Sequence, residues 1–545
     1  MRWLASLALP LALIGAAADA REAVDASAPG KVSVTVYRDP ERGDGETLER
    51  NWPRGFAMIS ERRTVTLPAG ESTIRFEGVA EGMVAVSAIV TGLPGGTIEK
   101  NRNADLLSPA ALVDGTLGNR VRVTRTNPAT GRETTESAIV RTRADGGIVL
   151  QTSAGYEAVR CSGVPESLTF DRVPKGLSAQ PVFSIDTRDA TGGTYEVTLT
   201  YLAWGFDWQA HYVAQMGEGG AKGKTFFDLM SWLTILNDNG QSFEDADLLA
   251  VAGTLNVESD FEGLADAPAG RGLRLTCYPI GSTAAGTPVP YYAPGRDRSP
   301  PPAPMMMGYA DSDAIVVTGM RLARKEVMNA PVAVMAAEEQ LGDLKLYRIP
   351  EPVTVSAKGL KQVAFLDRKR VEGEFVYLTS CDQYGWQADW DELEAYPTTL
   401  NLETVNDDEH QLGVALPSGG VTIFEPSSFG PQLIAEQTLR DYAEGQDVEI
   451  ELAESSVVRA TCALASEGDE RKLESGKWAG MRVKLTNAGS RPATVRVALG
   501  YPTDWEFRTG RVKSRLKDGE TVIELEVKPG ETRLFDWKVR NTDRK

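Results

Sequence analysis

The chain contains two histidines, and each stands apart from other metal-binding side chains. His211 lies in WGFDWQAHYVAQM (residues 204–216), where aromatic residues and an aspartate surround it, a set that could bind a sugar or a metal ion. A metal site needs three or four converging ligands, commonly His, Cys, Asp or Glu. His410 lies far along the chain, in the polar turn NDDEHQ. A zinc enzyme or a His-based catalytic triad is therefore disfavoured.

Three carboxylates form a second candidate. Asp389, Asp391 and Glu392 lie beside two tryptophans in CDQYGWQADWDELEAY (Cys381–Tyr396). Glycosidases use a pair of carboxyl groups as acid and base or nucleophile. These three are neighbours in sequence, however, and no distant partner carboxylate can be identified. A solvated loop or strand edge is the favoured interpretation, and a glycan contact is the alternative.

A third candidate, NDNGQSFEDADL (Asn237–Leu248), is rich in oxygen ligands and could suggest calcium. It lacks the alternating acidic spacing of an EF-hand loop. We interpret it as a hairpin turn at Asn239–Gly240 between two strands. GxSxG, HExxH, P-loop and dinucleotide-binding glycine patterns do not occur in the sequence. The sequence thus assigns no catalytic, cofactor-binding or metal-binding residue, and no cofactor.

The element that holds His211 is predicted from the alternation of apolar residues. One face of residues 204–216 carries Trp204, Phe206, Trp208, Ala210, Tyr212, Ala214 and Met216, and the other carries Gly205, Asp207, Gln209, His211 and Gln215, with Val213 as its only apolar exception. This alternation predicts a long strand with a buried aromatic face and a solvated face, on which His211 has a structural role. Upstream, Tyr195–Tyr201 place apolar residues at odd positions, so we expect a bulge or a strand bend in Leu202–Ala203.

The same period of two recurs through most of the chain and predicts an all-β fold. Residues 62–76 and 118–140 each read as a hairpin, with turns at Pro68–Gly70 and Asn127–Gly131. Near the C-terminus, residues 481–485 and 495–499 present apolar residues that face each other, and residues 522–539 repeat the pattern. Several β-sandwich, immunoglobulin-like domains are the natural inference.

One segment breaks the pattern. From Gly281 to about Ala330, Pro, Gly and Ser dominate the first half, which predicts a disordered insertion that extends to residue 340. The expected organisation is a signal peptide (1–20), an N-terminal β domain (21–104), a small β domain (105–190), a central β-sandwich (191–280 and 341–435) interrupted by the insertion (281–340), and a C-terminal immunoglobulin-like sandwich (436–545). Within the insertion, DAIVVTGMR (Asp313–Arg321) resembles the short strand that opens the plug of TonB-dependent outer-membrane receptors.

The N-terminus predicts export. Arg2, an apolar stretch from Trp3 to Ala18 and the small-residue pattern that ends at Ala20 are typical of a secretory signal peptide, with Arg21 as the first mature residue. No later segment approaches the length of a transmembrane helix. The expected location is periplasmic or secreted.

Charge and cysteine content limit the possible partners. The net charge of −18 disfavours binding to nucleic acid or to anionic lipid. The four cysteines, Cys161, Cys277, Cys381 and Cys462, are too widely spaced for a redox pair or a zinc cluster. One or two disulfides or buried thiols are expected, and the sequence leaves their pairing open.

A family resemblance agrees with this organisation. LTYLAWGFDWQAHYVAQM followed by SWLTILNDNGQSFEDADLLAVAGTLN resembles the signature of an uncharacterised bacterial domain in mucoidy-inhibitor-A-like proteins, through Tyr201, Trp208, Tyr212, Asn237, Gly240, Phe243, Ala246 and Val251–Gly253. The likeness runs from about Tyr195 to the C-terminus, and the segment with ERRTVTLPAGESTIRF resembles the small domain that often precedes it. The resemblance implies a fold but no activity or catalytic residues.

We therefore expect an exported, non-enzymatic protein of the bacterial envelope that acts by binding or scaffolding an envelope protein or glycan. Two alternatives remain. One is a glycan-active envelope enzyme with Asp389, Asp391 or Glu392 as acid or base. The other is an accessory to outer-membrane receptors that acts through Asp313–Arg321.

Overall fold

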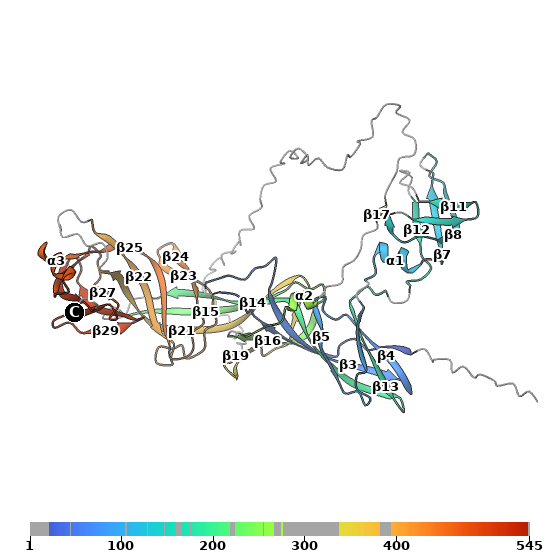
Figure 1. Ribbon diagram of the computed structural model, residues 1–545, viewed down its shortest axis with the longest axis horizontal. Coiled ribbons are helices and arrows are strands. Elements are labelled where there is room, and N and C mark those ends of the chain that lie inside the picture. The colour runs from blue at the N-terminus through green and yellow to red at the C-terminus, as the bar shows by residue number, and fades with distance from the viewer. Residues whose placement is uncertain are drawn as a thin grey trace, which may run out of the picture. The chain divides into compact units, whose positions relative to one another are not determined.

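The computed structural model describes residues 21–542, with gaps at 44, 104–105, 128, 147, 160–165, 175–176, 218–223, 254, 266–273, 276–336 and 382–393. Strands dominate, which confirms the all-β class (Figure 1). The chain divides into two compact units: the first comprises Met1–Ala104, Gln180–Ala269 and Val334–Lys545, and the second comprises Asp105–Ala179 and Gly270–Ala333. None of the helices among the described residues is long and apolar enough to cross a membrane.

The first unit begins with two packed layers of strands. One layer has the order β1 (Glu22–Asp25), β4 (Gly70–Glu77), β13 (Val182–Asp189), β6 (Glu99–Asn103). The other is formed by β2 (Lys31–Tyr37), β3 (Gly55–Leu67), β5 (Met83–Thr91) and the first half of β14 (Gly193–Met216). Alternate apolar residues of both layers, such as Ile74 and Val65, meet in one core, so each layer covers the buried face of the other.

Strand β14 continues into the middle of the unit. Its second half pairs with β15 (Lys224–Asn237) and, in parallel, with β23 (Gly419–Ser427). The remaining strands of this region are β16 (Phe243–Ala252), β18 (Ala337–Leu341), β19 (Leu344–Arg348), β20 (Val353–Val355), β21 (Gly359–Ser380), β22 (Tyr396–Val405) and β24 (Gly430–Leu439). Their buried residues join the same core as the first two layers.

The C-terminal part has a core of its own. It contains β25 (Asp447–Leu464), α3 (Gly468–Glu474), β26 (Ala479–Asn487), β27 (Ala493–Gly500), β28 (Trp505–Arg508), β29 (Ser514–Lys517), β30 (Glu520–Val527) and β31 (Thr532–Asn541). The predicted facing residues of 481–485 and 495–499 are buried in this core. A disulfide joins Cys381, at the end of β21, to Cys462 on β25. Cys161 and Cys277 lie outside the described residues.

The second unit holds a five-stranded sheet with the order β11 (Gly155–Ala158), β10 (Val149–Thr152), β8 (Glu133–Val140), β7 (Arg120–Thr126), β12 (Glu166–Thr169). Helix α1 (Pro109–Gly115), capped by Ser108, contributes Ala110 and Val113 to its core. Strands β7 and β8 form the hairpin expected for residues 118–140. The two-residue strands β9 (Asp145–Gly146) and β17 (Arg274–Leu275) pair in parallel.

Two predicted hairpins are wrong. Strand β3 pairs with β2 and β14, whereas β4 pairs with β1 and β13, so the chain passes from one layer to the other at Pro68–Gly70. Likewise, β15 pairs with β14 and β21, whereas β16 pairs with β2, β19 and β20. Asn237–Ser242 therefore connects two separate ladders. In sequence, a short turn between two alternating segments looks the same whether the two strands pair as a hairpin or belong to different ladders.

The domain limits also differ from those expected. Residues 182–189 pair with β4 and β6, and so belong with the N-terminal strands instead of with the small domain. Residues 274–275 pair with β9 of the second unit instead of joining the central sandwich. The expected insertion lies mostly outside the described residues, but residues 337–340 belong to strand β18.

Candidate functional site

The aromatic stretch of β14 is interrupted by a bulge at Gly205. The register against β3 shifts between Trp204 and Phe206, and Gly205 has a φ of +86°. Before the bulge the odd-numbered residues Tyr201 and Ala203 are buried. After it the even-numbered residues, beginning with Phe206 and Trp208, are buried. The change of buried face therefore lies beyond the predicted Leu202–Ala203, although the register of β14 against β5 also shifts between Thr200 and Leu202.

Because of this shift, the aromatic residues predicted to share one face lie on two sides of the strand. Phe206, Trp208 and Tyr212 lie in the core, as predicted. Trp204 is half-buried on the opposite side of the strand, so its assignment to the core is corrected. The prediction assumed that even-numbered residues face the core both before and after Gly205. Glycine has no side chain, so the sequence does not show that the buried face changes there.

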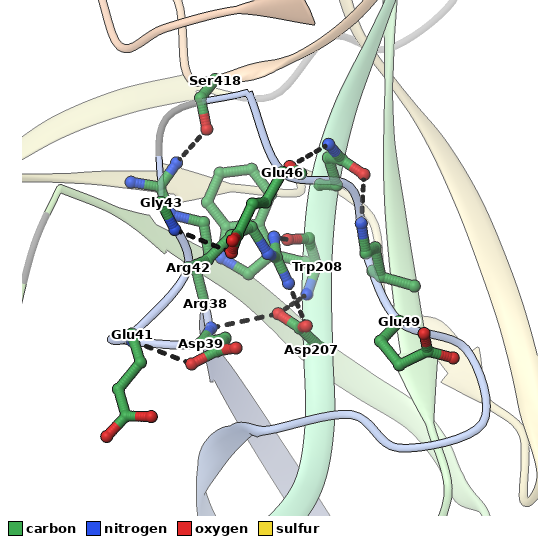
Figure 2. Close-up of polar contacts among 12 residues, drawn as sticks. Arg38, Asp39, Glu41, Arg42, Gly43, Glu46, Glu49, Asp207, Trp208 and Ser418 are labelled. Carbon is green, nitrogen blue, oxygen red and sulfur yellow. Dashed lines mark hydrogen bonds and ion pairs between the residues drawn. The ribbon is translucent and has the colours of Figure 1, made fainter.

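Asp207 is also corrected, because it is buried instead of solvated: only 1% of its surface is exposed. Its carboxylate forms an ion pair with Arg42 and accepts the backbone N–H groups of Trp208 at 2.8 Å and Asp39 at 3.2 Å (Figure 2). Burial raises the pKa of Asp207 to about 6 and lowers the pKa of Arg42. Arg42 belongs to residues 38–54, which connect β2 to β3, so the ion pair fastens this connection to β14.

Three more contacts fix this connection, which we call the 38–54 strap. Arg38 donates to both oxygens of Asp441, at 3.0 and 2.6 Å, and to the Ser418 hydroxyl at 2.6 Å. Gln209 of β14 accepts the backbone N–H of Leu48 at 2.8 Å. The strap is thus held along its length by polar contacts.

The strap, Trp204 and the segment around α2 (Phe261–Ala265) line an open cavity of about 390 Å³, the Trp204 pocket. Three aromatic residues contribute to its wall. Phe56 contacts Phe261 edge-on, with ring centroids 4.9 Å apart, and stacks on Tyr37 at 4.8 Å. Among the described residues, the indole N–H of Trp204 has no hydrogen-bond partner.

The charged side chains that line the pocket are Asp39, Glu41, Arg54, Asp260 and Glu262. Asp39 accepts the backbone N–H of Glu41 at 2.9 Å, and Arg54 forms an ion pair with Glu41. Asp260 accepts the N–H of Gly263 at 2.8 Å. The carboxylates therefore come from two separated segments on either side of the aromatic wall.

The histidines lie in different surroundings. His211 is half-buried on β14, its Nε2 lies 3.3 Å from the Thr422 hydroxyl, and burial lowers its pKa. Nδ1 of His410 lies 2.7 Å from Asp407 in the turn after β22. Among the described residues no group of three or more His, Cys, Asp or Glu could hold a metal ion. Asp389, Asp391 and Glu392 lie outside the described residues.

His410 also lines a second, charged cavity of about 300 Å³. There Glu374 and Glu403 lie opposite each other on β21 and β22. Arg496 binds both oxygens of Glu403, at 2.6 and 2.8 Å, whereas Glu374 has no ion-pair partner among the described residues. Burial, followed by the charge of Glu403, raises the pKa of Glu374. Most charges in this cavity are thus neutralised by one another.

The sequence contains only weak signals for the Trp204 pocket. The strap RDPERGDGETLERNWPR is rich in charge and turn-forming residues between two strands, which is ordinarily typical of a solvated loop. Its burial of Asp207 depends on a contact between segments far apart in the sequence. Comparisons of the chain with protein-family models, curated proteins and solved structures found no match.

Proposed function

We propose that this protein is exported to the bacterial envelope and acts there by binding a ligand in the Trp204 pocket, without catalysing a reaction. Export rests on the signal-peptide pattern of residues 1–20. The Cys381–Cys462 disulfide supports this location, because such bonds persist in oxidising compartments.

The observation that carries the binding proposal is the unpartnered, half-buried indole of Trp204 in the wall of a cavity. The volume of about 390 Å³ falls within the usual range of small-ligand sites, roughly 300–1,000 Å³. Aromatic walls supply contact area, while polar groups at the rim give orientation. The strap that forms one side is fixed in advance, which reduces the entropy lost on binding.

Native mass spectrometry tests binding directly. The mature protein is incubated with a small-molecule extract of the bacterial envelope, and bound species are detected by their added mass. We expect a ligand that the wild type retains and the Trp204→Leu variant loses. A Trp232→Leu control alters an exposed tryptophan that does not line the pocket, and should retain the ligand.

Two results would contradict this proposal. Retention of the same ligand by both tryptophan variants would place binding elsewhere. If alanine replacements at Asp389, Asp391 or Glu392 abolished a biochemical activity without changing the melting temperature, a glycan-active enzyme would replace the binding protein.

A further inference from the structure

The charge of the Trp204 pocket indicates the class of its ligand. Four carboxylates and one guanidinium line the cavity, and the guanidinium of Arg54 already pairs with Glu41. Among the described residues Glu262 has no hydrogen-bond or ion-pair partner. Asp39 and Asp260 accept backbone N–H groups, which orient the carboxylates but do not cancel their charge. The cavity therefore has an excess of negative charge.

The aromatic wall adds a second, independent attraction for a cation. The face of an aromatic ring carries negative electrostatic potential, and a cation within about 6 Å of the ring centre gains roughly 0.5–2 kcal/mol. Trp204 gives the strongest interaction of this kind, and Phe261 lies on the same cavity. An anionic ligand would oppose both the rings and the carboxylates, and a neutral ligand would leave the carboxylates uncompensated.

The size of the site favours an organic cation over a metal ion. Carboxylates that bind a metal converge on one point at about 2.0–2.6 Å. The described residues provide no group of three or more potential ligands that could do so. Instead, the acidic residues at 39–41 and 260–262 are distributed around a cavity of about 390 Å³. A bulky cation can reach these carboxylates and the rings together.

We propose that the Trp204 pocket takes an organic ammonium group, packed against Trp204 and Phe261 and paired with Glu262 and its neighbouring carboxylates. This inference rests on the proposed binding function and specifies its ligand class. The ammonium could belong to a small molecule or to a lysine side chain, since both present the same chemistry to the pocket.

Pairs of compounds that have a similar shape but differ in charge measure how much the positive charge contributes to binding. Isothermal titration calorimetry on the mature protein compares choline with 3,3-dimethylbutan-1-ol, its neutral carbon isostere. A second pair compares N-acetyl-lysine amide with N-acetyl-norleucine amide. We expect at least one cationic probe to bind about tenfold more tightly than its neutral partner, and to weaken with rising salt. The pair with the larger difference identifies the source of the ammonium group.

Matched variants locate the binding. Trp204→Leu removes the aromatic face but keeps an apolar side chain, and Glu262→Gln removes one charge. Each should weaken binding of the cationic probe by about tenfold. Trp232→Leu and Glu258→Gln are controls, because neither residue lines the pocket, and both should bind as the wild type does. Unchanged melting temperatures show that the variants are folded.

Three results would overturn the ammonium inference: equal binding of the charged and neutral probes, no binding of either cation at 10 mM, or equal loss in the pocket and control variants. The proposed function is judged separately. A neutral or anionic ligand that is recovered from the envelope extract and lost in Trp204→Leu would keep the binding function and reject the ammonium group.

Discussion

At the scale of single residues, Trp208 and His211 occupy opposite faces of β14. Trp208 is fully buried, donates its indole N–H to the carbonyl of Val251 at 3.1 Å and packs edge-on against Tyr347. His211 is half-buried, and its imidazole Nε2 lies 3.3 Å from the Thr422 hydroxyl. We therefore expect the Trp208 side chain to contribute much more to the free energy of unfolding than the His211 side chain does.

We expect Trp208→Ala to lower the free energy of unfolding by about 3–5 kcal/mol, because it removes a large core side chain. His211→Ala should cost less, about 1 kcal/mol, because it removes a half-buried side chain instead of a core one. Chemical denaturation with and without added zinc measures both. A zinc-dependent stabilisation that His211→Ala removes would show that the histidine belongs to a metal site instead.

Asp207 gives a prediction about pH. Its folded-state pKa of about 6 exceeds the value of about 3.9 in an unfolded chain, so the folded state holds the proton more tightly. The stability from this group is therefore fully present below pH 4 and lost as pH rises through 6. Relative to Asp207→Asn, which cannot titrate, the wild type should lose about 2 kcal/mol of unfolding free energy between pH 4 and pH 7, out of the roughly 3 kcal/mol that the whole pKa shift represents.

Urea denaturation of both proteins at several pH values measures this difference. The comparison between the two proteins cancels the titration of the other carboxyl groups. A difference that is independent of pH, or that grows in favour of the wild type as pH rises, would contradict a raised pKa. In that case the ion pair with Arg42 would outweigh burial.

At the scale of elements, the Gly205 bulge decides which face of β14 Trp204 occupies. A side chain at Gly205 would be strained by the φ of +86° and would approach Nδ2 of Asn239 to 3.2 Å. Asn239 is buried, and it holds the carbonyl of Trp204 at 3.0 Å and the N–H of Gly82 at 2.6 Å. The bulge is thus locked by its neighbours.

Gly205→Val should therefore destabilise the protein by about 2 kcal/mol or more, through left-handed strain together with crowding of Asn239. Gly445→Val is a matched control: its φ is +82°, but among the described residues no atom beyond its two chain neighbours lies within 4 Å of an added Cβ. It should show the strain alone, and so a smaller loss on thermal or urea denaturation. Equal losses in the two variants would mean that the contact with Asn239 contributes nothing.

At the scale of the whole molecule, strands on either side of the 276–336 segment share one core. Strand β15 pairs with β21 from Lys224 to Asn237, and β14 pairs with β23. These ladders join residues before the segment to residues after it. The Cys381–Cys462 disulfide lies entirely after it and does not link the two parts.

Limited proteolysis should cleave at Arg296 or Arg298, within the Pro- and Gly-rich sequence, and leave the two fragments associated. We expect a single peak in size-exclusion chromatography under native conditions and two bands after denaturation, with or without reductant. Fragments that separate under native conditions would show that the paired strands do not hold the unit together.

The alternation of apolar residues allowed the strand content to be predicted from sequence. Trp208, Tyr212, Met481 and Val495 are buried as their spacing indicates. Period two is a local property, because successive side chains of a strand point to opposite faces wherever the strand lies. The signal-peptide pattern and the resemblance to mucoidy-inhibitor-A-like proteins are further properties of the sequence that remain predictions.

Only the tertiary structure decided which strands pair and which polar residues are covered. The turns after β3 and β15 look like hairpins locally, yet each leads into a different ladder. Asp207 occupies a position that alternation assigns to solvent, and it is buried because Arg42 and the strap cover it. Such contacts join segments distant in sequence, and their free energy depends on both partners, so no local pattern contains them.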